Sequence, residues 1–292
     1  YSLKFILYMR SNSPFITETS HVIHEIYYML RHYDWKKYGS ALRKPMLVFM
    51  VNNAKGFYVG GMVDRFKGMI STYAWCKQRN IDFRIRHIFP FELADYLDPS
   101  HYDWRLRENE FSTSIWDATL MRARGEYGRR LVKKKKIRKQ IHYYGNRDFL
   151  DYINQTGGTN YTWGELFKEL FQPGKELLEL VKQKSREINK PYISAVFRFQ
   201  NLLGDFEEYK FSTLNDENRR EELIKKCLNG LIDLQEQYPE MSILVTSDST
   251  TFIDRASELP GICVIGGKRV HMGCTADAAY DTYLNSFVDF YM

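Results

Sequence analysis

Apolar runs and short polar or glycine-containing breaks alternate along this chain of 292 residues, in the order strand, helix, strand. The apolar run from Pro45 to Asn52 predicts a buried strand, and the next apolar positions, over about 62–78, recur at the spacing of a helix. Residues 81–88 alternate as a half-buried strand does, and Pro90 closes that strand. This succession is typical of a parallel sheet that is covered by helices.

A second block with the same alternation begins after Pro191. Its predicted strands and helices are, in order, 192–199, 217–238, 242–248, 250–257, 262–266 and 277–286. Residues 98–164, between the two blocks, lack a clean period, and we expect helices and loops there. The pattern therefore predicts an α/β protein with two Rossmann-like domains, an N-terminal domain of residues 1–170 and a C-terminal domain of residues 171–292.

The composition is that of a folded protein without a membrane-spanning segment. Apolar residues make up 44% and charged residues 27% of the chain. No apolar run reaches the roughly 18–20 residues that cross a bilayer, and the first ten residues, YSLKFILYMR, predict a strand. The cysteines lack metal-ligand spacing, so we expect reduced thiols, no bound metal and a cytoplasmic protein. They are Cys76, Cys227, Cys263 and Cys274.

The formal net charge of +6 favours anionic ligands but does not choose among nucleic acid, phospholipid headgroups and nucleotide sugars. Much of the excess lies within residues 129–139. A solvated helix face is the simplest interpretation of this basic segment, and peripheral contact with the inner face of a membrane or with another polyanion is the alternative. Because no nucleic-acid-binding motif accompanies it, we expect no nucleic acid partner.

Arg198 is the first candidate for chemistry, because it follows a strand that Pro191 separates from the preceding helix. Open α/β sheets bind their ligands outside the carboxyl ends of the strands. A guanidinium there is a permanently charged fork that suits a phosphate or a diphosphate. An ordinary surface arginine at a strand end is the alternative that this residue alone leaves open.

A glycine-rich turn, GGMVDRFKG, precedes the helix predicted at 62–78. Gly60 and Gly61 allow a tight turn and a close backbone approach to a ligand. Asp64 and Arg65 fall in the first helical turn, where free N–H groups attract an anion. A simple turn with an acid near the helix dipole is equally consistent. The segment is neither a P-loop nor a dinucleotide-binding fingerprint.

Two further polar groups follow strands or interrupt apolar faces in the second block. Ser247, Asp248 and Ser249 lie at the carboxyl end of the strand predicted at 242–248 and would either cap the next helix or hold a ribose and phosphate. Asp281 lies on a mostly apolar helix face, where a carboxylate is costly unless it is paired. Guanine, which presents N1–H and N2–H₂ side by side, is a suitable partner, and a buried salt-bridging aspartate is the alternative.

Taken in order, these segments resemble the superfamily of GDP-fucose-dependent fucosyltransferases, which includes the α1,2-, α1,6- and protein O-fucosyltransferases. GGMVDRFKG resembles the glycine-rich loop and helix of its first domain. VFRFQNLLGD, TSDS and DTYLNSFVDF resemble the three motifs of its second domain. Two positions depart from the family pattern, because Val196 stands where the family has a histidine and the acidic Asp205 arrives later than usual.

The resemblance implies a GT-B fold with two domains facing a cleft, and an inverting, metal-independent transfer of fucose from GDP-fucose to a glycan acceptor in polysaccharide biosynthesis. It implies that Arg198 holds the β-phosphate and that Asp281 reads the base. The other residues expected near the donor are Gly60, Gly61, Arg65, Ser247, Asp248 and Ser249. Asp64, with Asp205 behind it, is the candidate catalytic base. Two alternatives stay open: a transferase that uses another nucleotide sugar, and a non-catalytic protein that binds a polyanion or a membrane surface.

Overall fold

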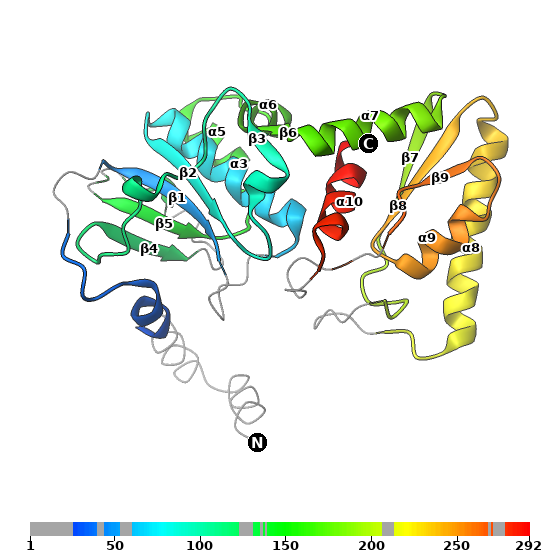
Figure 1. The fold of residues 1–292 in the computed structure, drawn as a ribbon, viewed down its shortest axis with the longest axis horizontal. Helices are drawn as coiled ribbons and strands as arrows, with labels where there is room; N and C mark the ends of the chain where they lie inside the picture. The colour runs from blue at the N-terminus through cyan, green and yellow to red at the C-terminus, as the bar shows by residue number, and fades with distance from the viewer. Residues whose placement is uncertain are drawn as a thin grey trace, which may run out of the picture. The chain divides into compact units, whose positions relative to one another are not determined.

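The computed structural model describes residues 26–39, 44–52, 60–122, 131–134, 137, 139–205, 213–267, 270 and 278–292. They form two compact units (Figure 1). The first unit takes its described residues from Tyr1–Val59, Val63–His87 and Asp103–Phe167, and the second from Gly60–Met62, Ile88–Tyr102 and Lys168–Met292. The chain passes from the first unit to the second for the last time between Phe167 and Lys168, close to residue 170. The segment Ile88–Tyr102, however, belongs to the second unit. The strand predicted for the first ten residues lies outside the described ones.

The described part of the first unit is built on a parallel sheet with the strand order β2-β1-β5-β4. Its strands are β1 (Met46–Val51), β2 (Asp82–His87), β4 (Ala118–Arg122) and β5 (Gln140–Tyr144). Every residue of β1 is buried, as its unbroken apolar run predicts. Helix α3 (Met62–Gln78) connects β1 to β2, which confirms the predicted strand, helix and strand.

The prediction of helices and loops for residues 98–164 is wrong for two segments, because β4 and β5 lie there and complete the sheet. β5 has the sequence QIHYY, and its polar Gln140 and His142 hide the strand from an apolar pattern. Both side chains are buried nonetheless, since hydrogen bonds satisfy them. The same region also contains the short helices η2 (Glu108–Glu110), α5 (Leu150–Gly157) and α6 (Trp163–Leu170).

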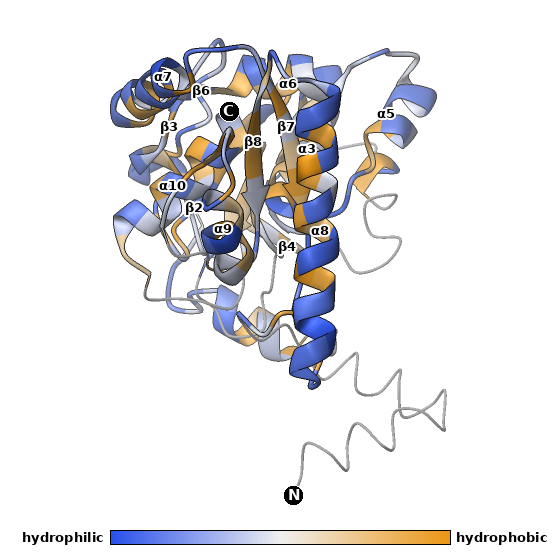
Figure 2. Cartoon of the chain, turned by 90° about the vertical axis from the view of Figure 1, so that its right-hand side faces the viewer, coloured by the Kyte–Doolittle hydropathy of each residue, from blue (hydrophilic) through white to orange (hydrophobic). Residues whose placement is uncertain are grey.

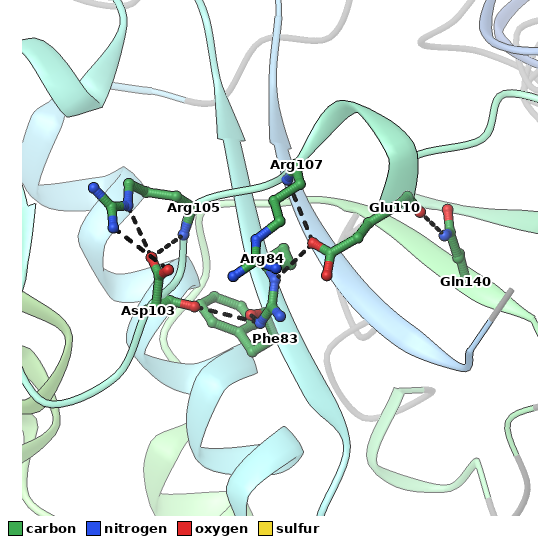
Figure 3. A network of polar contacts seen from close by, with 7 residues as sticks. All are labelled: Phe83, Arg84, Asp103, Arg105, Arg107, Glu110 and Gln140. Carbon is green, nitrogen blue, oxygen red and sulfur yellow. Dashed lines mark hydrogen bonds and ion pairs between the residues drawn. The ribbon is translucent and has the colours of Figure 1, made fainter.

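A polar network attaches the segment around η2 to the edge strand β2 (Figure 3). Arg84 on β2 donates to the Glu110 carboxylate at 3.2 Å and to the Asp103 carbonyl at 3.3 Å. Glu110 Oε2 also accepts from the Arg107 amide at 3.4 Å, and the Gln140 side chain donates to the Glu110 carbonyl. The network therefore joins η2 to β2 and to β5, and Arg105 forms an isolated parallel bridge with Ile85 beside it.

The second unit contains a parallel sheet of strand order β7-β8-β9 among its described residues. The strands are β7 (Tyr192–Phe197), β8 (Ser242–Ser247) and β9 (Ile262–Val264). Two helices, α8 (Glu217–Gln237) and α9 (Thr250–Ser257), cover one face of it (Figure 1). Ile224 and Leu231 of α8 pack there with Ile243 and Val245 of β8. In Figure 2 strands β7 and β8 are mainly hydrophobic, whereas α8 is largely hydrophilic with apolar positions at intervals.

The remaining described elements of the second unit pack around its C-terminal helix. They are η1 (Leu93–Asp95), β3 (Leu97–Pro99), β6 (Phe171–Pro173), α7 (Lys175–Ile188) and α10 (Tyr280–Tyr291). β3 pairs with β6 antiparallel, and Tyr96 stacks on both Tyr280 and Phe287 of α10. These contacts explain why Ile88–Tyr102 belongs to this unit. They also explain why α10 runs beyond the predicted end at 286, since Phe287 and Val288 are buried.

Candidate functional site

The carboxyl ends of β7 and β8 bring two predicted site residues together. The strands are parallel neighbours in which Phe197 pairs with Ser247, so Arg198 and Asp248 leave them side by side. β7 ends at Phe197 rather than at the predicted residue 199, because Gln200 has a φ of 57° and the chain turns there. Arg198 lies on the exposed face of β7 together with Val196, which is 74% exposed.

Asp248 binds the beginning of the loop that follows β7. Its Oδ1 accepts from the Phe199 amide at 2.8 Å, and its Oδ2 accepts from the Gln200 amide at 2.8 Å. The same Oδ2 forms an ion pair with the guanidinium of Arg198. The side chain of Arg198 is 49% exposed and that of Asp248 only 13%, so the guanidinium lies at the surface on top of a largely buried carboxylate.

Asp205, further along this loop, binds the first turn of α9. Its Oδ2 accepts from Ser249 Oγ at 2.6 Å, and its Oδ1 accepts from the amide and the hydroxyl of Thr251, each at 2.9 Å. Ser249 is the N-cap of α9, because its Oγ accepts from the Phe252 amide at 3.0 Å. Ser247 Oγ accepts from the Ser249 amide at 3.1 Å. Capping and loop contacts thus occupy the short polar residues that the sequence singled out.

Asp281 lies in the first turn of α10 and is exposed, which corrects the expectation of a carboxylate on a buried apolar face. An acidic side chain is stabilised there by the positive end of the helix dipole. Asn285, one turn later on the same side of α10, contacts the loop after β9, since a Cβ on Gly267 would lie 2.6 Å from Asn285 Nδ2. Asp281 therefore belongs to the helix face that carries this contact with the loop after β9.

The glycine-rich segment has a different environment. Gly60 has a φ of 74°, a left-handed conformation that favours glycine, whereas a Cβ on Gly61 would meet no atom within 4 Å. Arg65 is only 2% exposed and hydrogen-bonds His87 Nε2 at 3.1 Å, so this guanidinium points into the first unit. Asp64 is half-exposed and forms an ion pair with Lys67 at 3.3 Å.

Of the basic segment 129–139, residues 129, 130, 135, 136 and 138 lie outside the described residues. Of its cations, Lys139 donates to the Ile115 carbonyl at 3.1 Å, and burial lowers the pKa of Lys134. Among described residues, no three His, Cys, Asp or Glu side chains gather closely enough to hold a metal ion. Nor does any helix in the described ranges combine the length and the apolar character that a bilayer crossing requires.

Sequence reasoning missed Thr251 and the amides of Phe199 and Gln200 as partners of the two aspartates. The signal that could have found them is topological: two consecutive parallel strands place the residues that follow them at one edge of a sheet. Applied to β7 and β8, this rule places Asp248 within reach of the loop that begins at Arg198.

The fold of two α/β units with parallel sheets is that of the GT-B fucosyltransferases. Among solved structures the chain is similar to NodZ alpha-1,6-fucosyltransferase co-crystallised with GDP, with a TM-score of 0.52 and 11% identity over 85% of this chain and 84% of that one. It is also similar to fucosyltransferase NodZ from Bradyrhizobium, with a TM-score of 0.53 and 11% identity over 85% of each chain. No protein-family model and no curated protein matches the sequence. At this identity the likeness shows the fold.

Proposed function

We propose that this protein is a glycosyltransferase that transfers fucose from GDP-fucose to a glycan acceptor, with inversion and without a metal ion. One observation carries the proposal: a half-exposed arginine is fixed by a carboxylate at the carboxyl edge of a parallel sheet. The solved structures with a similar fold include NodZ soaked with GDP-fucose. A diphosphate is the ligand class that suits a fixed guanidinium at such an edge.

The proposed chemistry follows from where charge develops. The acceptor oxygen forms a bond to the anomeric carbon of the sugar while the bond from that carbon to the β-phosphate oxygen breaks, and GDP leaves with the electron pair. Negative charge therefore grows on the β-phosphate, where Arg198 would stabilise it. The amides of Phe199 and Gln200 donate their hydrogen bonds to Asp248. We therefore assign the guanidinium, and not these amides, to the phosphate.

The acceptor hydroxyl must lose its proton as it attacks, and we propose Asp64 as the base that takes it. Asp64 is half-exposed in the first turn of α3, with Lys67 as its partner. Asp205 is the weaker candidate, because both of its oxygens already accept hydrogen bonds from Ser249 and Thr251.

Arg198→Ala is the direct test. We expect transfer from GDP-fucose to fall by at least about 100-fold, since one well-placed donor to a developing anion contributes at least that much. Arg219→Ala removes the same charge from an exposed position on α8 and should leave turnover unchanged. Near-normal turnover by Arg198→Ala, with the fold intact by circular dichroism, would falsify the assignment.

A further inference from the structure

Asp248 is engaged in a way that a donor-binding residue would not be. It accepts from three donors at the start of the loop after β7: the guanidinium of Arg198 and the amides of Phe199 and Gln200. Its side chain is 13% exposed, against 49% for Arg198. A ligand that approaches this edge of the sheet would therefore meet the guanidinium before it met the carboxylate.

We propose that Asp248 is a positioning residue, which fixes Arg198 for a diphosphate and does not contact the donor itself. The inference rests on the proposed function, because it takes Arg198 as the phosphate-binding group. It replaces the direct donor contact that the sequence predicted for Asp248.

The chemistry of the two side chains supports this division of roles. Arginine has several rotatable bonds and loses rotamer freedom when it is held by a ligand. A guanidinium already fixed by Asp248 loses less on binding, which is the general benefit of preorganisation. Arginine also presents five N–H donors in a planar fork, a geometry that allows one guanidinium to contact a carboxylate and a phosphate at the same time.

Asp248 also holds the backbone that carries Arg198. Gln200 has a φ of 57°, a left-handed conformation that is unfavourable for a residue with a side chain. Its amide, which this turn directs toward β8, is donated to Asp248 Oδ2 at 2.8 Å. Asparagine at 248 has one acceptor oxygen in place of two, so at least one of the two amides would lose its partner.

Asp205 secures the same loop further along the chain and through a different element. It binds Ser249, the N-cap of α9, and Thr251 in its first turn, and none of these contacts involves Arg198. The segment from Arg198 to Asp205 is thus attached to the turn after β8 at both of its ends, by Asp248 at one end and by Asp205 at the other. Asp248 acts on the guanidinium directly, whereas Asp205 stabilises the loop as a whole.

A double-mutant cycle on GDP binding, measured by calorimetry on the full chain, tests this role. The variants are Asp248→Asn, Arg198→Ala and the double variant, with Asp254→Asn, an exposed residue of α9, as the matched control. We expect Asp248→Asn alone to weaken GDP binding by about 10-fold, the effect of one hydrogen bond to a charged group. In the Arg198→Ala background the same change should have less than about a 2-fold effect, because Asp248 acts through the arginine.

An equal loss in both backgrounds, or no loss in either, would overturn the inference. If Asp248→Asn fails to fold, Asp248→Glu displaces the carboxylate by one methylene and enters the same cycle with the same expectation. Failure of the unmodified protein to bind GDP would count against the proposed function and not against the positioning role of Asp248. Amide hydrogen exchange then tests that role without a ligand. Exchange at Phe199 and Gln200 should accelerate in Asp248→Asn, and unchanged exchange would overturn the positioning role.

Discussion

At the residue scale, Asp281 differs from Asp248 and Asp205, the other two acidic candidates of the second unit, because it is exposed. Asp248 and Asp205 are occupied by loop contacts, whereas Asp281 projects from the first turn of α10 with its side chain accessible. A carboxylate can accept both N1–H and N2–H₂ of guanine, and each hydrogen bond to a charged group contributes about 1.5–3 kcal/mol. Base recognition is therefore the role that we assign to Asp281.

Inosine diphosphate, which lacks the N2 amino group, tests this role. We expect the protein to bind GDP about 10-fold more tightly than inosine diphosphate, because one charge-assisted hydrogen bond is lost. Asp281→Asn should bring the two affinities together, while Asp233→Asn, at an exposed position of α8, should preserve the difference. Calorimetric titration of both nucleotides measures the ratio. An unchanged ratio in Asp281→Asn would remove this residue from base recognition.

The sequence identified several of these residues but not their contacts. Arg198 could be placed at a strand end because Pro191 and the alternation that follows it define β7. The pairing of Asp248 with the amides of Phe199 and Gln200 could not be predicted from the sequence, because it depends on which strands are neighbours and on a left-handed turn at Gln200. Arg65 was expected near the donor because it falls in the first helical turn after the glycine-rich turn, and its burial against His87 depends on how α3 packs, which the sequence does not show.

At the scale of elements, a chain of buried polar groups joins the helical segment 26–32 to the first sheet. Asn52 Nδ2 donates to Tyr144 Oη at 2.8 Å, and that hydroxyl donates to His32 Nδ1 at 3.2 Å. His32 Nε2 donates to His142 Nδ1 at 2.8 Å, and His142 Nε2 donates to Gln140 Oε1 at 3.2 Å. These directions follow from neutral imidazoles, each with one donor and one acceptor nitrogen, since burial lowers the pKa of both histidines.

Acid should weaken this attachment. Burial, and then the charge of Arg86, lower the pKa of His32 to about 4, and burial and the neighbouring His32 lower that of His142. A depressed folded-state pKa means that the unfolded chain binds more protons. The contribution to stability is therefore complete above the ordinary histidine pKa of about 6.5 and is lost as the pH falls toward 4. The loss from His32 amounts to about 2–3 kcal/mol.

Urea unfolding at pH 7.5 and at pH 5 measures this dependence. We expect the free energy of unfolding to drop at pH 5 in the unmodified protein, and to drop less in a His32→Asn, His142→Asn double variant. His101→Gln removes an exposed histidine and should retain the full drop. A double variant as acid-sensitive as the unmodified protein would show that the sensitivity arises elsewhere.

The packing of α3 on the first sheet gives a prediction of opposite sign at two glycines. A Cβ on Gly68 of α3 would lie 2.4 Å from the Gly145 carbonyl and 2.9 Å from the Phe49 ring, so Gly68→Ala forces the helix away from β1. We expect a loss of about 1–3 kcal/mol, typical of overpacking. Gly230→Ala, exposed on α8 with no atom within 4 Å, should gain about 0.5–1 kcal/mol from helix propensity. Denaturant midpoints compare the two, and equal shifts would contradict this view of the packing.

Element predictions from the sequence succeeded where the pattern was apolar and failed where buried strands were polar. β1, α3, β2, β8 and α9 follow from runs or periods of apolar residues. β4 and β5 do not, because neither ATLMR nor QIHYY is a continuous apolar run although both strands lie inside the sheet or at its edge, and the burial of His142 depends on His32 from a distant segment. Tertiary hydrogen bonds of this kind leave no local signal in a sequence.

At the scale of the whole molecule, two parallel-sheet units carry the resemblance that single motifs suggested. The strand and helix alternation was enough to predict an α/β chain with two such units. That alternation could not predict that Ile88–Tyr102 belongs to the second unit, because this depends on aromatic contacts with α10 and not on the order of elements along the chain. An identity of 11% to NodZ at a TM-score of 0.52 shows how far such a fold tolerates sequence change.

The stability of the whole molecule should report its ligand. A ligand that binds only the folded chain raises the free energy of unfolding by about 2.7 kcal/mol at 100 times its Kd. If Arg198 and Asp281 act as proposed, GDP should raise the melting temperature more than UDP or CDP, since all three present a diphosphate but only guanine offers paired donors. Arg198→Ala should reduce all three shifts, and Asp281→Asn should reduce only that of GDP.

Equal shifts for the three nucleotides would contradict base recognition and favour a donor other than GDP-fucose. No shift with any of them, together with a salt-sensitive shift by heparin, would instead favour the polyanion-binding alternative.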